Sequence, residues 1–206
     1  MAFIDGSCAG FVGALASKDA VPGGGCASAF IGAVGTALGS MVGNLTVGKK
    51  KYAGVEADII GYLERASALQ SEFLRLIDED AAVFEPLSKA YGIPKEDPDR
   101  AQIMEDALKL ACTAPLDTMR ACAKAIGLLE EFANKGSVMA VSDAGAGAAF
   151  LRAAIIGASF NVFINTKAMA DRESADRINT EANALLEEYV AKAGAIVAGV
   201  YGKVCG

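Results

Sequence analysis

Apolar residues recur along this chain at helical spacing, in long stretches that glycine and proline separate. No run alternates strictly between apolar and polar residues, as a half-buried strand would. The pattern predicts about six helices: residues 4–16, 26–47, 53–90, 97–134, 142 to the polar segment at 171–173, and from there to about 202. It therefore predicts an all-α bundle of long antiparallel helices, with residues 1–206 as a single domain.

Capping residues and prolines refine the later helices. Asp97 followed by Pro98 is typical of a helix start, and Pro115 is expected to bend the fourth helix because proline lacks a backbone donor. Ser142 and Asp143 are interpreted most simply as an N-cap and an acidic residue that complements the helix dipole.

The second predicted helix has two distinct sides and no charge. A helical projection groups glycines on one side and larger apolar residues on the other. The small-residue side consists of Gly32, Gly35, Gly39, Gly43 and Thr46. The side of larger apolar residues consists of Phe30, Val34, Leu38, Met41 and Leu45. Glycine inside a helix costs about 0.5–1 kcal/mol relative to alanine, so close approach must compensate for it. Tight contact with another helix, within the chain or across a subunit interface, and direct ligand contact both fit.

Composition raises the possibility of a membrane protein. Of the 206 residues, 53% are hydrophobic, and residues 26–47 are long enough to cross a bilayer. That stretch is dominated by Gly, Ala, Ser and Thr, which favours a buried helix of a soluble protein over a membrane span. The N-terminus lacks the basic start of a secretory signal, so a cytoplasmic protein is expected.

Charge and residue usage restrict the chemistry. A net charge of −6 disfavours nucleic acid as a partner, although the Lys49, Lys50, Lys51 cluster is suited to an anionic small molecule. The five cysteines show no C-x-x-C spacing and predict neither disulfides nor a zinc site. The chain contains no histidine, so acid/base work falls to Asp, Glu, Lys, Tyr or Cys.

Asp80 is the residue that periodicity singles out. It interrupts an apolar helical stripe formed by Leu69, Phe73, Leu76, Ile77, Phe84 and Leu87. An ionised carboxylate on a buried face is costly unless it is paired or used. A structural salt bridge and a catalytic role both remain open for it.

Backbone N–H groups and side-chain amides are further candidates for binding a ligand. The turn at Gly23, Gly24 and Gly25 exposes N–H groups at a helix N-terminus, which suits an anion or a carbonyl oxygen. Asn161 and Asn165 lie on one helical face and need partners from another helix or a ligand.

Several of these segments together resemble the formimidoyltetrahydrofolate cyclodeaminase and methenyltetrahydrofolate cyclohydrolase family. They are PGGG at 22–25, NLTVGKKKY at 44–52, LIDEDAAVF at 76–84, SDAGAGA at 142–148 and NVFIN at 161–165. One departure is Cys26, where the family pattern has a small hydroxyl residue. The resemblance implies an all-α cyclodeaminase-like fold, a homodimer or dimer-based oligomer, a tetrahydrofolate substrate, and no metal or organic cofactor.

The resemblance also implies site residues. Asp80 is expected to be the main acid/base group, with Asp78 supporting it and Lys49 supplying a proton or binding a substrate carboxylate. The candidates for holding the folate are Gly23, Gly24, Gly25, Asn44, Lys50, Ser142, Asp143, Asn161 and Asn165.

Two activities fit this resemblance. The first is hydrolysis of 5,10-methenyltetrahydrofolate to 10-formyltetrahydrofolate. The alternative is the ammonia-releasing cyclodeaminase reaction, which forms the methenyl compound from 5-formiminotetrahydrofolate. A non-catalytic folate-binding or oligomerisation module is the second alternative.

Overall fold

The computed structural model describes residues 3–205, and these residues form helices and no strands. The α-helices are α1 (Cys8–Leu15), α2 (Gly24–Asn44), α3 (Glu56–Ala90), α4 (Arg100–Ala111), α5 (Thr113–Lys135), α6 (Val141–Ala168) and α7 (Arg172–Val204). Short 3-10 helices cover Phe3–Asp5, Lys50–Val55 and Val138–Ala140. The predicted all-α bundle is confirmed.

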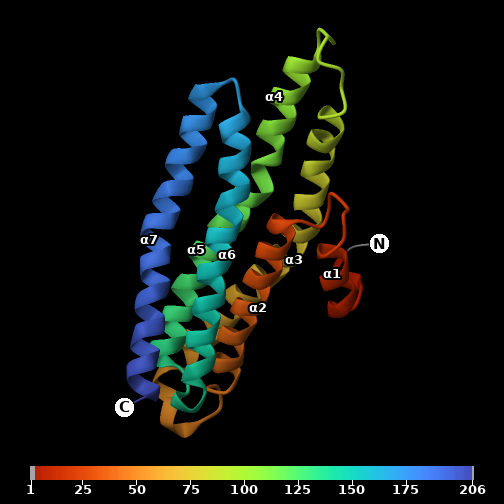
Figure 1. Cartoon of the computed structure of the whole chain (residues 1–206). Helices are drawn as coiled ribbons and strands as arrows, with labels where there is room; N and C mark the ends of the chain where they lie inside the picture. The colour runs from red at the N-terminus through yellow and green to blue at the C-terminus, as the bar shows by residue number, and fades with distance from the viewer. Residues whose placement is uncertain (1–2, 206) are drawn as a thin grey trace.

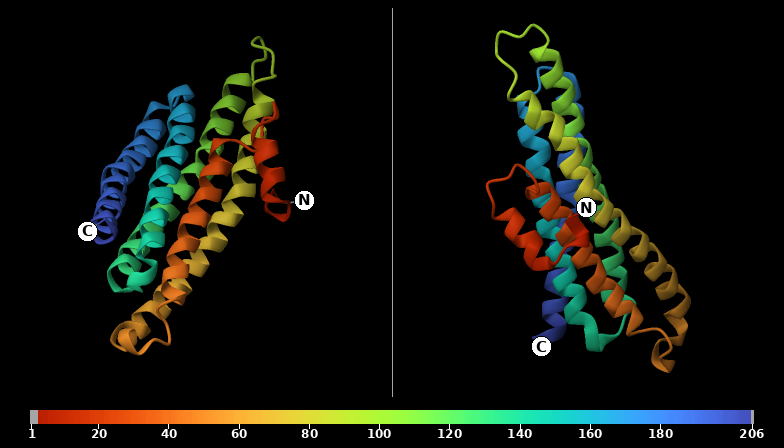
Figure 2. Two further views of the ribbon diagram at one scale, coloured as in Figure 1. Left: turned by 60° about the horizontal axis from the view of Figure 1, so that its bottom comes forward. Right: turned by 90° about the vertical axis from the view of Figure 1, so that its right-hand side faces the viewer.

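Helix α2 packs between α3 and α6 and runs antiparallel to both, as α6 does to α5 and α7, whereas α2 and α7 run parallel to α5 (Figure 1). Helices α4 and α5 follow each other along one direction, and α7 covers α5 and α6 (Figure 2). Helix α1 lies on the outside of the bundle beside α2, and its buried Phe11 packs against Phe30 of α2 with ring centroids 5.2 Å apart.

Some predicted boundaries are wrong. The first predicted helix is a 3-10 turn followed by α1, because the Ser7 hydroxyl accepts a hydrogen bond from the Gly10 N–H and starts a new helix. Helix α2 ends at Asn44, and its connection turns at Gly48, whose φ of 77° suits glycine. Ser142 is not an N-cap, because α6 begins at Val141 behind a 3-10 turn.

The fourth predicted helix is two helices. Helix α4 ends at Ala111 and α5 begins at Thr113, close to the bend expected from Pro115. Pro115 has no N–H to give the Ala111 carbonyl four residues earlier. The Asn165 side chain of α6 donates this hydrogen bond instead, from Nδ2 to the Ala111 carbonyl oxygen at 3.1 Å.

The glycines of α2 permit unusually close packing. A Cβ on Gly32 would lie 2.5 Å from the Phe73 ring, and one on Gly43 would lie 2.7 Å from the Phe132 ring. At the crossing of α2 and α6, a Cβ on Gly147 would lie 2.6 Å from the Gly35 carbonyl oxygen. Contact between helices within the chain therefore explains the glycine side of α2.

Helix α2 and the helical stretch Val138–Ala168 are each apolar and long enough to cross a membrane. Both are packed into the bundle, with about half of each apolar window buried against neighbouring helices. Length and composition are therefore weak evidence for a membrane span here.

Gly147→Ala is expected to destabilise the protein by about 1–3 kcal/mol, because the obstructing atom belongs to the backbone of α2 and cannot rotate away. Gly194→Ala is the matched control: it lies inside α7, and a Cβ there would meet nothing within 4 Å. The control should be neutral or slightly stabilising. Urea unfolding of both variants measures the difference, and equal effects would contradict this account of the crossing.

Candidate functional site

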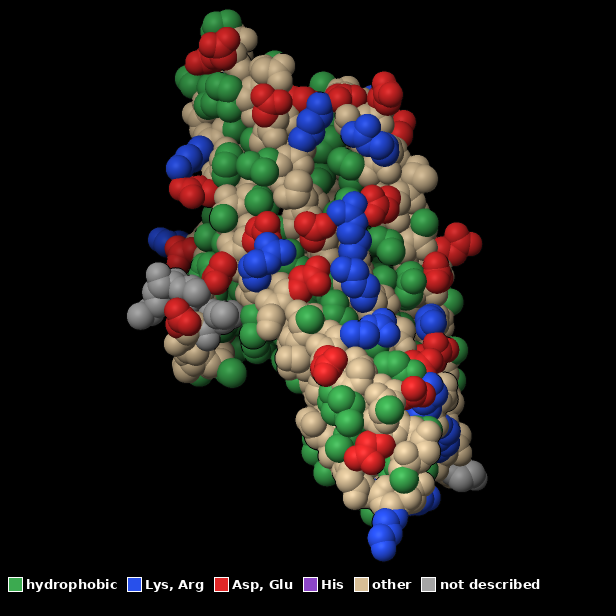
Figure 3. Space-filling view, turned by 180° about the vertical axis from the view of Figure 1, so that it is seen from behind, with side chains coloured by type: hydrophobic (Ala, Val, Ile, Leu, Met, Phe, Trp, Pro, Cys, Tyr) green, Lys and Arg blue, Asp and Glu red, His purple; other side chains and the backbone are tan. Residues whose placement is uncertain are grey.

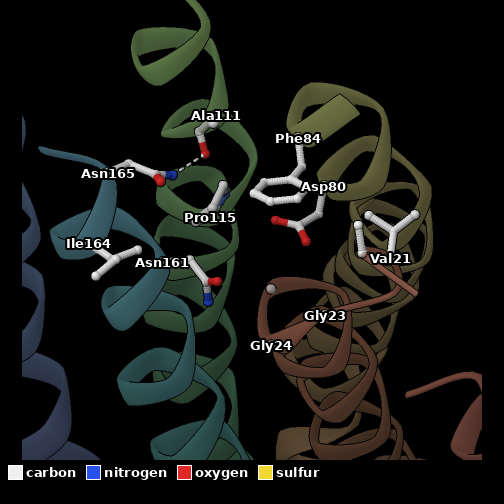
Figure 4. Close-up of a pocket in the computed structure, with 12 residues that line it drawn as sticks. Val21, Gly23, Gly24, Asp80, Phe84, Ala111, Pro115, Asn161, Ile164 and Asn165 are labelled. Carbon is white, nitrogen blue, oxygen red and sulfur yellow. Dashed lines mark hydrogen bonds between the residues drawn. The ribbon is translucent and has the colours of Figure 1, made fainter. Parts of the chain in front are cut away.

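A cavity of about 170 Å³ opens where four helical segments meet (Figure 4). They are the N-terminus of α2, the second half of α3, the α4–α5 junction and the C-terminal half of α6. The lining residues are Ala20, Val21, Gly23, Gly24, Gly25, Asp80, Phe84, Ala111, Pro115, Asn161, Ile164 and Asn165. Asp80 is the only ionisable side chain among them.

Asp80 lies one turn beyond the fully buried Leu76 and Ile77, and its carboxylate meets the first turn of α2. Gly25 makes this approach possible, because a Cβ at that position would collide with both carboxylate oxygens. The Cys26 thiol donates a hydrogen bond to Asp80 Oδ2 at 3.3 Å. Asp80 makes no ion pair among the described residues, so the structural salt bridge left open by its sequence position is absent there.

Burial raises the pKa of Asp80 above its usual value, and hydrogen bonding from Cys26 partly offsets this increase. Burial, followed by the nearby Asp80 charge, raises the pKa of the Cys26 thiol to about 12. The thiol therefore stays protonated and remains a donor near neutral pH. A carboxyl group with a raised pKa can both accept and return a proton.

The first turn of α2 supplies backbone donors beside this carboxylate. Its N-cap is Gly23, which has no side chain to cap the helix, and the first backbone bond runs from the Ala27 N–H to the Gly23 carbonyl. The preceding N–H groups have no acceptor within the helix. They lie at the positive end of the helix dipole and favour an oxygen that carries negative charge.

The two asparagines of α6 are oriented differently. Asn165 is buried and donates a hydrogen bond to the Ala111 carbonyl. This structural contact accounts for an asparagine at that buried position. Asn161 donates from Nδ2 to the Gly157 carbonyl of its own helix at 3.1 Å. Its amide lies opposite Gly24 on the cavity wall, where Oδ1 can accept from a ligand (Figure 4).

The other predicted site residues lie outside this cavity. Asp78 Oδ1 accepts a hydrogen bond from the Phe3 backbone N–H at 2.9 Å, on the side of the N-terminal segment. The remainder gather at the opposite end of the bundle: Asn44, Lys49, Lys50, Ser142 and Asp143. The 21 residues of α2 separate the two ends by about 30 Å.

Sequence reasoning did not anticipate the Cys26 contact with Asp80 or the part that Pro115 and Ala111 play in the cavity. Cys26 and Asp80 are 54 residues apart, and no periodicity links them. The one available signal was the departure at Cys26 itself. Within residues 3–205, no three His, Cys, Asp or Glu side chains form a group that could hold a metal ion.

Comparison with known proteins agrees with this architecture. Residues 7–184 match the family model described as formiminotransferase-cyclodeaminase. The chain is 40% identical to the methenyltetrahydrofolate cyclohydrolase of Methylorubrum extorquens, over 93% of this chain and 92% of that protein. It is 30% identical to the mouse formimidoyltransferase-cyclodeaminase over 94% of this chain, but spans only 37% of that longer protein.

A solved structure shows the same fold. The formiminotetrahydrofolate cyclodeaminase of Thermotoga maritima superposes with a TM-score of 0.84 and 28% identity, covering 97% of this chain and 96% of that one. The predicted resemblance is therefore confirmed over most of the chain. The chain belongs to the formiminotransferase-cyclodeaminase family.

Proposed function

We propose that this chain is a cytoplasmic methenyltetrahydrofolate cyclohydrolase that hydrolyses 5,10-methenyltetrahydrofolate to 10-formyltetrahydrofolate. The main support is the near full-length similarity to the Methylorubrum cyclohydrolase, together with a half-buried, unpaired carboxylate in a cavity. The cyclodeaminase reaction is the second candidate, which the names of the mouse and Thermotoga proteins favour.

Asp80 has two tasks in this proposal. Ionised, it removes a proton from the water that attacks the cationic methenyl carbon, so that a C–O bond forms and a tetrahedral carbon results. As the C–N5 bond breaks, the protonated Asp80 gives its proton to N5 and the remaining hydroxyl loses its proton to solvent. The balance is one water consumed and one proton released.

The other cavity groups hold the substrate in this proposal. The N–H groups of Gly24 and Gly25 donate to oxygen atoms of the substrate, including the oxygen that gains charge at the tetrahedral carbon. Asn161 Oδ1 accepts from an N–H of the pterin. The substrate is a tetrahydrofolate derivative, water is the second reactant, and no metal or organic cofactor takes part. The protein works as a homodimer or a dimer-based oligomer.

Asp80→Asn is expected to lower turnover of 5,10-methenyltetrahydrofolate by about 10²–10⁴-fold, because the amide cannot take the proton from water. The loss of the methenyl absorbance measures this rate.

Release of ammonia from 5-formiminotetrahydrofolate by the wild type would favour the cyclodeaminase. Folate binding without either turnover would favour a binding module.

Stability provides the folding control for this variant. Because the pKa of Asp80 is raised in the folded state, ionisation of this group destabilises the fold as pH rises from the unfolded value of about 4 through the folded pKa. Asp80→Asn should therefore be more stable than the wild type at pH 7, and this advantage should disappear near pH 3. A variant that is inactive and also less stable at pH 7 would contradict the assignment.

Cys26→Ser should shift the acidic limb of the kcat/KM profile to lower pH, because a hydroxyl is a stronger donor than a thiol and stabilises ionised Asp80. Cys26→Ala removes the donor and should shift the same limb to higher pH. Shifts of these two variants in the same direction, or an unmoved limb in both, would show that Cys26 does not tune Asp80.

A further inference from the structure

The N-terminal segment lies on the outside of the bundle and forms part of the cavity wall. Residues 3–21, which we call the N-terminal arch, begin against α3 and end with Ala20 and Val21 on the wall of the cavity. Val21 lies on the same side of the cavity as Asp80, opposite Asn161 (Figure 4). Both ends of the arch thus lie near the turn of α3 that contains Asp78 and Asp80.

Few contacts hold the arch to the bundle. Phe11 is the buried residue of α1, and its ring packs on Phe30 of α2. Val12 is 62% exposed, and residues 16–20 are exposed as well. Within the described part of the chain, residues 5–21 make no hydrogen bond to the helices of the bundle.

Packing beneath the arch is also incomplete. A cavity of about 100 Å³ lies between residues 3–11 of the arch and Phe30, Leu74 and Ile77 of α2 and α3. Atoms that line a void lose dispersion contacts, so this side of the arch is weakly held. A segment with few buried contacts and an exposed backbone opens at a low free energy.

Asp78 is the residue of α3 that fixes the start of the arch. Its Oδ1 accepts a hydrogen bond from the Phe3 N–H at 2.9 Å, and the Phe3 ring packs edge-on against Phe11. A carboxylate is a stronger acceptor than a neutral group, so this is a firm contact in a weakly held segment. Asp78 and Asp80 are two residues apart, so helical geometry directs their side chains about 200° apart around α3. Asp78 is accordingly not among the residues that line the cavity.

We infer that Asp78 is a positioning residue: it holds the N-terminal arch so that Ala20 and Val21 close the cavity over Asp80 and the substrate. This inference rests on the proposed function. The cavity volume of about 170 Å³ is below the roughly 300–1,000 Å³ of pockets for ligands of drug size, and opening of the arch enlarges it. The other wall residues belong to α2–α6 or cap them, and these helices pack against one another, so the arch is the part of the wall that can move.

Kinetics of three variants test the role of Asp78. Asp78→Ala should raise the KM for 5,10-methenyltetrahydrofolate about 3–10-fold, the range for one lost hydrogen bond, and leave kcat almost unchanged, because the wall contacts ground state and transition state alike. Asp78→Asn keeps an oxygen that accepts from the Phe3 N–H, so its KM should be close to the wild-type value. Glu79→Ala is the matched control: it removes a neighbouring charge, which is paired with Arg75 on the same helix, and should change neither constant.

Two kinetic outcomes would overturn the inference. If the KM of Asp78→Asn rises as far as that of Asp78→Ala, the charge of Asp78 matters and its contact with Phe3 does not. If Asp78→Ala lowers kcat and leaves KM unchanged, Asp78 acts in the chemical step.

Trypsin measures the arch without turnover and therefore separates this inference from the proposed function. Basic side chains are spread over the face of the bundle shown in Figure 3, but most lie on helices, which trypsin cleaves only after local unfolding. Lys18 lies in the exposed part of the arch, and Lys95, in the exposed loop between α3 and α4, is the internal reference. Asp78→Ala should speed cleavage after Lys18 about 3–10-fold and leave cleavage after Lys95 unchanged, measured by mass spectrometry of the fragments.

Equal cleavage after Lys18 in the wild type and in Asp78→Ala would overturn the inference, whichever substrate the protein turns over. Faster cleavage after both lysines would overturn it too, because the loss of Asp78 would then loosen the whole bundle. If neither folate is turned over but cleavage after Lys18 alone is faster, the proposed function fails while the hold of Asp78 on the arch stands.

Discussion

The fold depends on how closely α2 can approach its neighbours. Its glycines leave no side chains on one side, so Phe73 of α3, Phe132 of α5 and the backbone of α6 at Gly147 pack directly against the helix. Such contacts gain dispersion energy that offsets the conformational cost of glycine within a helix. The same constraint sets the position of the α2 N-terminus, and the site is built around that N-terminus.

At that N-terminus, Gly25 leaves room for the Asp80 carboxylate, and the Cys26 thiol donates to it. Three effects act on this group in opposite directions: burial raises its pKa, while the thiol and the helix dipole favour the ionised form. A carboxyl group with a raised pKa can both accept and return a proton, as the addition of water to a cationic carbon requires. The opposite wall of the cavity lies at the junction of α4 and α5. Because Pro115 has no N–H, the Ala111 carbonyl accepts a hydrogen bond from the Asn165 side chain instead.

The outer surface has a charged part and an apolar part. Ion pairs connect α3, α5 and α7, whereas α2 and α6 turn an apolar face outward beside the cavity. No cationic side chain is among the residues that line this cavity.

Local patterns were sufficient for the fold class, for most helices and for Asp80, because helical periodicity and proline or glycine breaks act within a few residues. The glycine side of α2 and the apolar stripe around Asp80 were both visible in the sequence. Contacts between distant segments were not: Cys26 with Asp80, Asn165 with Ala111, and Gly35 with Gly147. Likewise, the sequence grouped Lys49 and Asp143 with Asp80, and only the tertiary structure placed them at the other end of the bundle. Periodicity specifies which side of a helix is buried, whereas packing decides which helix lies against that side and at what height.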